Sequence, residues 1–328
     1  MMVMIGKKML NSDYLGKKAE AGIPIAALRP ADSSANEGHR QAGLKRLARS
    51  VGNWMSGRKA SLVMASAAMV LSASPMAYAA ASIQPNLRGL AAEITAQAKQ
   101  AGKEVGVTII NLNSGSTWSM NGNWMTIAAS TYKLPLLMDI AQGITDGRYS
   151  RTAVVCGIPS DVEVGSPNYT GQCININALA YLVGHNSDNT AAHMLVRYIG
   201  GYNALNAYAL QHGAQHPTFF WPNTTDSNDL AALWHNEAQG KAGGKAAQNW
   251  LYPKLTHTEW ESGIPAGVPR WVTVTHKVGM IYGETNDAAL VRYNKSAYIL
   301  TIVSNGPGGT DWGLLAQISR DVWNRETR

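Results

Sequence analysis

Ala128-Ala-Ser-Thr-Tyr-Lys-Leu-Pro-Leu136 is the stretch of sequence that indicates both a fold and a chemistry. Its apolar residues, continued to Ile140, predict a helix that opens near Ser130. Residues three apart share a helix face, so Lys133 Nζ can reach Ser130 Oγ. A serine becomes a good nucleophile when a base takes its proton, and a lysine can be that base where burial or a neighbouring cation lowers its pKa. Backbone N–H groups at the first helical turn also favour developing negative charge.

Two further motifs are needed, because roughly one chance match to S-x-x-K is expected in a chain of this length. Ser187-Asp-Asn189 lies 57 residues downstream of Ser130, where a predicted helix begins, although the same three residue types are ordinary helix caps. His276-Lys-Val-Gly279 follows a β-branched run and precedes Met280, although an exposed strand lysine before a turn glycine would look the same. Three motifs in this order are far more specific than any one of them.

The hydrophobic periodicity around these motifs predicts a mixed α/β (α+β) fold. Helices are expected over residues 87–102, 131–140, 175–184, 189–199, 202–211, 226–237, 245–255 and 310–325. Strands are expected over residues 105–112, 117–120, 271–275, 287–292 and 296–304. The two groups of strands are expected to share one antiparallel sheet, with the helical stretch inserted between them as a second subdomain.

The three motifs together resemble the signature of the class A β-lactamases and penicillin-binding serine hydrolases, which is S-x-x-K, S-D-N and K-T-G in that order. The resemblance covers about residues 83–326, since Ile199-Gly-Gly201 and Gly263-Ile-Pro-Ala-Gly-Val-Pro269 are also similar to family sequence. It implies a β-lactamase/transpeptidase-like fold with a five-stranded antiparallel sheet flanked by helices, plus an all-helical subdomain. The active site would lie between the two parts.

The resemblance implies three catalytic side chains. Ser130 would be the acylated nucleophile, Lys133 its base or proton relay, and Ser187 the group that hands a proton to the leaving nitrogen. Substrate binding would fall to Asn189, which would also bond Lys133.

The third motif would complete the implied site. Lys277 would supply positive potential for the substrate carboxylate and for Ser187, and Gly279 would line the substrate site. The backbone N–H groups of Ser130 and Met280 would form the oxyanion hole. Such donors are typically worth ~3–4 kcal/mol each in transition-state stabilisation.

Two departures from the family pattern weaken the expectation of efficient turnover. Val278 replaces the motif threonine, so one hydroxyl contact to the substrate carboxylate is absent, at a cost of about 1.5–3 kcal/mol. The family's Ω loop carries a glutamate that activates the deacylating water, yet residues 190–225 contain neither Asp nor Glu. Asp226 and Asp229 come next and are expected to cap a helix. His212 and His216 lie in the gap, where they are expected to be surface residues rather than a base or a zinc pair.

The sequence therefore predicts acylation more strongly than hydrolysis of the acyl group, and three interpretations stay open. The first is a β-lactamase-like hydrolase with an unfamiliar base, acting on a β-lactam or a related cyclic or peptide amide. The second is a D-alanyl-D-alanine peptidase or esterase of the same fold, acting on cell-wall peptide. The third is a penicillin-binding sensor module that does not turn over.

The first 79 residues are expected to be a leader rather than part of the fold. Arg58 and Lys59 precede an apolar run of about twelve residues, and Ala77-x-Ala79 follows, which are the three parts of a secretory signal peptide. Export to the periplasm or the exterior is predicted, with cleavage after Ala79. Met55 would give a leader of normal length, so translation is expected to start near it.

The mature part, residues 80–328, is expected to be one serine hydrolase domain, with a sheet part over 80–128 and 268–328 and a helical part over 129–267. Cys156 and Cys173 are its only cysteines. In an oxidising compartment they could close a loop, worth roughly 3 kcal/mol, and two unpaired thiols are the alternative.

Charge and composition exclude several other classes. Residues 1–79 hold 11 basic and 4 acidic side chains, which leaves 17 of each in residues 80–328, so a basic nucleic-acid-binding body is excluded. The apolar run is too short to span a bilayer. No cofactor and no metal are predicted, the partner is a small β-lactam or a cell-wall peptide, and the sequence does not set the oligomeric state.

Overall fold

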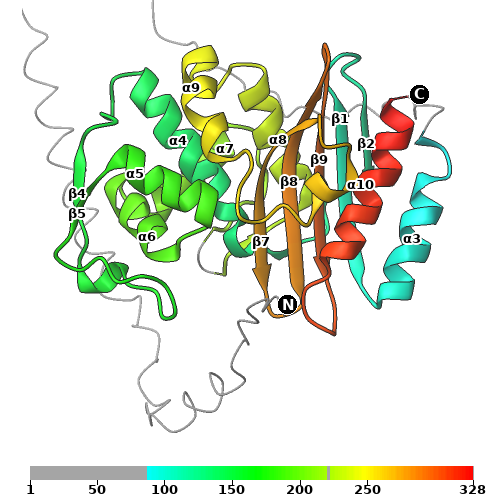
Figure 1. Cartoon of the computed structure of the whole chain (residues 1–328), viewed down its shortest axis with the longest axis horizontal. Helices are drawn as coiled ribbons and strands as arrows, with labels where there is room; N and C mark the ends of the chain where they lie inside the picture. Colours follow the sequence, from blue (N-terminus) through cyan, green and yellow to red (C-terminus); the bar gives the residue numbers. More distant parts are fainter. Residues whose placement is uncertain (1–86, 220–221, 328) are drawn as a thin grey trace, which may run out of the picture. The chain divides into compact units, whose positions relative to one another are not determined.

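The computed structural model describes residues 87–219 and 222–327, and the predicted leader lies outside them. The core of the described chain is a five-stranded antiparallel sheet in the order β2-β1-β9-β8-β7 (Figure 1). Its strands are β1 (Glu104–Asn111), β2 (Thr117–Met120), β7 (Thr273–Ile281), β8 (Glu284–Tyr293) and β9 (Ser296–Asn305). The expectation that the first two and the last three predicted strands share one antiparallel sheet is confirmed.

Strand β7 is longer than its sequence pattern predicted. The β-branched run indicated a strand over residues 271–275, whereas β7 continues to Ile281. It continues because Lys277 pairs with Ala288 of β8, and because that pairing extends beyond Gly279, whose turn tendency it overrides. The third motif therefore lies inside an edge strand.

Two helices cover one face of the sheet, α3 (Leu90–Ala101) and α10 (Trp312–Glu326), which lie side by side in Figure 1. The residues that α3 buries recur every four positions, which is one helical face, and they are Leu90, Ile94 and Ala98. Asp311 begins α10, since its Oδ1 accepts the backbone N–H of Leu314 at 2.9 Å. Both helices were predicted, with α3 beginning three residues later than expected.

The other face of the sheet carries α8 (Ser227–Ala238), which leads into the helical part of the fold. Trp234 of α8 is fully buried and donates its indole N–H to the carbonyl of Ala288 on β8 at 3.0 Å. The helical part surrounds α4 (Lys133–Thr145), most of whose residues are buried. Its other helices are α5 (Ile176–Tyr181), the π-helix η5 (Leu182–Asn186), α6 (Asn189–Tyr198), α7 (Tyr202–Gln211) and α9 (Gly244–Leu251), with short 3-10 turns at η3 (Ala129–Tyr132), η4 (Pro159–Asp161), η6 (Tyr252–Lys254) and η7 (Ile264–Gly267).

Two short sheets within or beside this helical part were not predicted. Strands β3 (Thr126–Ile127) and β6 (Thr224–Thr225) pair with each other, and β3 lies just before η3, which we call the nucleophile turn because it holds Ser130, the predicted nucleophile. Strands β4 (Val154–Cys156) and β5 (Cys173–Asn175) form the second pair. Strands of two or three residues carry too little alternation to be recognised from the sequence.

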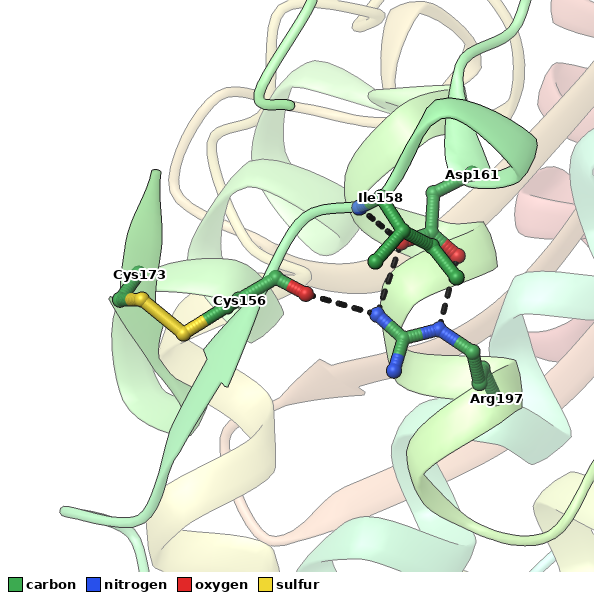
Figure 2. The surroundings of a disulfide bond; sticks show 5 residues. All are labelled: Cys156, Ile158, Asp161, Cys173 and Arg197. Carbon is green, nitrogen blue, oxygen red and sulfur yellow. Dashed lines mark hydrogen bonds and ion pairs between the residues drawn. A yellow bond between two sulfur atoms is a disulfide. The ribbon is translucent and has the colours of Figure 1, made fainter. Parts of the chain in front are cut away.

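Cys156 and Cys173 are register partners in the β4–β5 pair and form a disulfide (Figure 2). Of the two alternatives that the sequence left open, the structure has the bonded pair. The guanidinium of Arg197 on α6 donates to the carbonyl of Cys156 at 2.8 Å and pairs with Asp161 at 2.8 Å. The disulfide-closed loop is therefore fastened to the helix that follows the second motif.

Within residues 87–219 and 222–327, no helix is long and apolar enough to cross a bilayer.

Candidate active site

Ser130 lies in the turn η3, which leads directly into α4. The residue before it, Ala129, has a φ of +47°, a left-handed conformation that is strained for any residue other than glycine. The turn is held in place by neighbours, since the backbone N–H of Ala128 donates to the carbonyl of Asn223 at 2.8 Å. The Asn223 amide in turn donates to the carbonyl of Ala129 at 3.2 Å. This strained turn projects Ser130 at the start of the central helix.

Lys133 is fully buried, and its Nζ is the centre of the polar contacts. It lies 3.0 Å from Ser130 Oγ, 2.6 Å from the carbonyl of Ser187 and 3.2 Å from Ser187 Oγ, and it also bonds Asn189 Oδ1. Burial, reinforced by the charge of Lys277, holds the pKa of Lys133 well below the usual range of a lysine, against the opposing carboxylates Asp188 and Glu163. A buried amine with a lowered pKa beside a serine hydroxyl can accept the serine proton.

The second motif divides its roles between capping and the site. Asp188 is the N-cap of α6, because its Oδ1 accepts the backbone N–H of Ala191 at 2.8 Å. Its other oxygen accepts the hydroxyl of Tyr169 at 2.9 Å. Ser187 does not cap the helix but ends η5 in a left-handed conformation with φ +61°. Helix capping therefore explains Asp188 alone, whereas the side chains of Ser187 and Asn189 both contact Lys133 Nζ.

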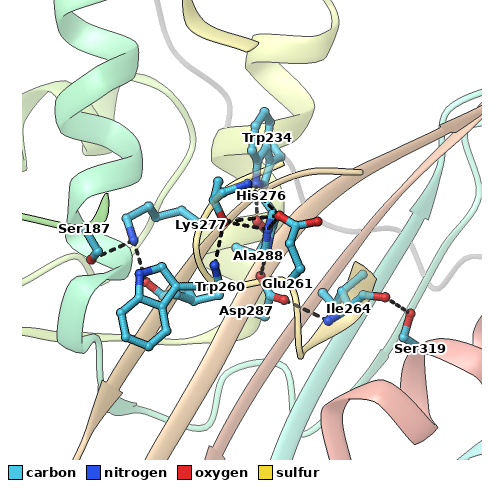
Figure 3. Close-up of polar contacts among 12 residues, drawn as sticks. Ser187, Trp234, Trp260, Glu261, Ile264, His276, Lys277, Asp287, Ala288 and Ser319 are labelled. Carbon is cyan, nitrogen blue, oxygen red and sulfur yellow. Dashed lines mark hydrogen bonds and ion pairs between the residues drawn. The ribbon is translucent and has the colours of Figure 1, made fainter. Parts of the chain in front are cut away.

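Lys277 reaches the same serine from the sheet. Its side chain is buried, and its Nζ donates to Ser187 Oγ at 3.0 Å and to the carbonyl of Val278 at 3.0 Å (Figure 3). Burial lowers the pKa of Lys277 to about 7, with Asp287 opposing the shift. Ser187 Oγ thus lies between two lysine amines, one from the helical part and one from β7.

Gly279 explains how β7 can lie so close to the nucleophile turn. A Cβ at this position would fall 2.6 Å from the carbonyl oxygen of Ala128 and 3.0 Å from the backbone nitrogen of Ser130. No side chain fits there without a shift of the backbone. The close contact also places Met280, the next residue on this edge strand, beside the turn that carries the Ser130 N–H.

The prediction for the carboxylates and histidines of residues 212–229 is confirmed only in part, since His216 is exposed as expected whereas His212 is half-buried. Asp226 caps α8 as predicted, with Oδ1 accepting the N–H of Asp229 at 2.7 Å. Asp229 caps nothing and instead accepts the backbone N–H groups of residues 215 and 216 at 2.6 and 2.9 Å. In the described part of the chain, these two carboxylates and His216 are close enough to share an ion, whereas His212 stacks on Tyr208.

One cluster beside the site was not recognised from the sequence. Buried His276, adjacent to Lys277, lies between the carboxylates of Asp287 and Glu261 (Figure 3). A histidine directly before the motif lysine was the available signal, but its partners lie 11 and 15 residues away and no periodicity connects them.

A serine with an adjacent buried amine, a second hydroxyl between two lysines and backbone donors at a strained turn is the arrangement that acyl transfer to serine needs. The Beta-lactamase enzyme family matches residues 89–325, so the chain belongs to that family. The resemblance to class A β-lactamases and penicillin-binding serine hydrolases, together with the fold it implied, is thereby confirmed.

Individual relatives are distant. The chain is 25% identical over 112 residues to β-lactamase PSE-4 of Pseudomonas aeruginosa, a match that covers 33% of this chain and 39% of that protein. It is 23% identical over 240 residues to β-lactamase CTX-M-97 of Escherichia coli, covering 68% and 82%. Among solved structures it is similar to a mutant of PBP-A in an acyl-enzyme complex with penicillin G, with a TM-score of 0.66, 25% identity and coverage of 72% of this chain and 95% of that one.

Proposed function

We propose that this chain is a serine hydrolase of the β-lactamase type, in which a β-lactam acylates Ser130. The observation that carries the proposal is the 3.0 Å contact between Lys133 Nζ and Ser130 Oγ, together with the lowered pKa of that buried amine. Membership of the β-lactamase family and likeness to a PBP-A acyl-enzyme with penicillin G support it.

The acylation step follows from the contacts. Neutral Lys133 takes the proton of Ser130 Oγ, and the oxygen forms a bond to the carbonyl carbon of the substrate. The developing oxyanion accepts the backbone N–H groups of Ser130 and Met280. As the C–N bond breaks, Ser187 Oγ gives its proton to the leaving nitrogen and receives one from Lys133, 3.2 Å away. Lys277 holds the Ser187 oxygen from the other side, and its protonated form supplies positive charge for a substrate carboxylate.

Hydrolysis of the acyl group is expected to be slower than its formation. After acylation Lys133 is neutral again and is the remaining base next to the ester. In the described residues no carboxylate contacts Ser130 Oγ or Lys133 Nζ. The hydrogen-bond partners of Lys133 Nζ are Ser130, Ser187 and Asn189. A D-alanyl-D-alanine peptidase or esterase, or a penicillin-binding sensor, is therefore the second candidate, and it predicts a long-lived adduct.

The test is the intact mass of residues 80–328 mixed with benzylpenicillin and followed from seconds to hours. An adduct on wild type that is absent from Ser130→Ala and slow on Lys133→Ala supports the proposal. Rapid loss of the adduct with accumulation of hydrolysed drug identifies a β-lactamase, and a persistent adduct favours the second candidate. Labelling of Ser130→Ala would contradict the assignment of the nucleophile.

We also propose that the protein is exported. The charged, apolar and Ala77-x-Ala79 parts of the leader support this, and so does the Cys156–Cys173 disulfide, since disulfides persist in oxidising compartments. Mass analysis of the protein recovered from the periplasm or medium of an expressing cell should find an N-terminus at Ala80. Full-length protein retained in the cytoplasm would refute the proposal.

A further inference from the structure

His276 is a buried histidine held between two carboxylates, on the residue before Lys277. Its Nδ1 lies 2.8 Å from Asp287 Oδ1 on β8, and its Nε2 lies 3.2 Å from Glu261 Oε1 and 3.3 Å from the hydroxyl of Thr258 (Figure 3). Burial alone would lower the pKa of His276, but Asp287 and Glu261 outweigh it and raise this pKa to about 9. The imidazolium therefore makes charge-assisted bonds to both carboxylates.

Residues 258–261, which we call the tether segment, are folded tightly onto this histidine. Glu261 Oε1 also accepts the backbone N–H of Thr258 at 2.7 Å and its hydroxyl at 3.2 Å. The hydroxyl of Thr258 accepts the backbone N–H of Trp260 at 3.1 Å. Three of the four residues are thus joined to one another by hydrogen bonds beside the same histidine.

The other side of the tether segment holds the end of η5. The backbone N–H of Glu259 donates to the carbonyl of His185 at 3.2 Å, and its carboxylate accepts the side-chain amide of Asn186 at 2.6 Å. The indole of Trp260 donates to the carbonyl of Asn186 at 3.3 Å. Asn186 is therefore held on both its side chain and its backbone.

These contacts connect the two elements that carry the proton-transfer groups. Asn186 is followed by Ser187, and His276 is followed by Lys277. The 3.0 Å contact between Lys277 Nζ and Ser187 Oγ thus joins two residues whose preceding neighbours, His276 and Asn186, are both hydrogen-bonded to the tether segment. A change in the segment would alter the separation of these two groups without touching either.

We propose that Glu261 is a positioning residue for acylation, which acts through His276 and the tether segment to place Ser187 against Lys277 and Lys133. The inference rests on the proposed function, since it assigns Glu261 to the proton transfer through Ser187. A misplacement of about 1 Å at a reacting group can cost roughly 100-fold in rate. A small shift of Ser187, transmitted from the tether segment, is therefore enough to slow acylation.

The first test compares Glu261→Gln with Glu326→Gln, a matched removal of a partly buried charge whose carboxylate bonds Asn111 on β1, three strands away from β7 in the sheet. Glu261→Gln should slow acylation at saturating benzylpenicillin by roughly 10- to 100-fold, with the half-saturating concentration unchanged within about twofold. Glu326→Gln should leave both quantities unchanged. Equal rates for wild type and Glu261→Gln would overturn the proposal.

A double-mutant cycle with Ser187→Ala separates positioning from a general loss of structure. Without the Ser187 hydroxyl there is no group left to position, so Glu261→Gln should have little further effect on acylation in that background. If the full loss persists on top of Ser187→Ala, Glu261 does not act through Ser187 and the proposal is wrong. Glu259→Gln, which removes the carboxylate of the segment that accepts the Asn186 amide, should reproduce the effect of Glu261→Gln in both backgrounds.

Hydrogen exchange supplies a readout that does not need a substrate. Glu261→Gln should speed amide exchange in the peptide that covers residues 182–188, and Glu326→Gln should not. Unchanged amide exchange in residues 182–188 would refute the role of the tether segment, whatever the rate of acylation by benzylpenicillin. If exchange changes but wild type forms no adduct, the proposed function has failed, and the positioning role of Glu261 in acylation fails with it.

Discussion

Gly279 offers a direct test of the idea that β7 must approach the nucleophile turn closely. In Gly279→Ala, the new Cβ would lie 2.6 Å from the carbonyl oxygen of Ala128 and 3.0 Å from the nitrogens of Ser130 and Thr131. Ordinary contacts of a methyl carbon with these atoms begin near 3.4 Å, so the turn and the strand must separate by several tenths of an ångström. Neither side is a flexible side-chain end, and both are backbone.

That separation acts on the two backbone donors of the proposed oxyanion hole. Overpacking of this kind costs typically ~1–3 kcal/mol of stability. Loss of one oxyanion donor costs about 100- to 1,000-fold in the rate of the chemical step. Gly279→Ala should therefore slow acylation by at least about 100-fold while the protein remains folded.

The assay is the acylation rate at saturating benzylpenicillin from intact mass, with thermal unfolding measured on the same samples. Gly313→Ala in α10 is the control, because its Cβ would meet no atom closer than 3.4 Å. It should leave acylation unchanged and, as a helix substitution, raise stability slightly. Acylation of Gly279→Ala within about twofold of wild type would refute the close-approach argument.

Three further outcomes are expected. Val278→Thr supplies the hydroxyl of the family motif with almost no change in volume, so the rate of acylation by benzylpenicillin should rise about 10- to 100-fold, while the rate with its methyl ester should not change. A similar rise for both compounds would contradict a contact to the carboxylate. Cys156→Ser with Cys173→Ser should lower the free energy of unfolding by roughly 3 kcal/mol in urea titrations, because the unfolded chain is no longer closed into a loop. Burial lowers the pKa of Lys277 from 10.5 to about 7, so between these pH values unfolding takes up a proton and the contribution of this group to the free energy of unfolding rises with pH. Lys277→Met should remove that rise. An unchanged dependence of the free energy of unfolding on pH would show that Lys277 stays charged in the folded protein over this range.

The parts of the fold that could be predicted are those in which local pattern and tertiary structure agree. The helix over residues 202–211 and the strand over residues 117–120 have the bounds that their periodicity indicated. The position of Lys133 beside Ser130 also followed from three-residue spacing at a helix start, a purely local relation. Such features depend on neighbours in the sequence, which a single chain displays.

The parts that could not be predicted depend on partners far along the chain. β7 extends beyond residue 275 because β8 pairs with it, and Asp229 holds a distant loop although its position beside Asp226 looked like a helix cap. His276 is the clearest case. As a strand residue it has no pattern of its own, and its role depends on Glu261 and Asp287, which reach it only after the chain has folded.

The site joins parts of the fold that have conflicting electrostatic requirements. Two lysine side chains, Lys133 and Lys277, are buried around Ser187 Oγ, and burial away from water lowers the pKa of each. The charge of Lys277 lowers the pKa of Lys133 further. A protein selected for stability alone would replace such amines with apolar side chains, since an unpaired buried charge is costly. In the proposed mechanism the cost has a chemical consequence: one proton moves among Lys133, Ser130 and Ser187 because no amine in the group holds it firmly. The positive φ of Ala129 and Ser187 adds backbone strain at the same points, and the surrounding contacts of Asn223 and the tether segment hold both turns in place. Stability is therefore lost where protons must move and regained in the contacts that fix the distances, which is why substitutions outside the three motifs are expected to change the rate.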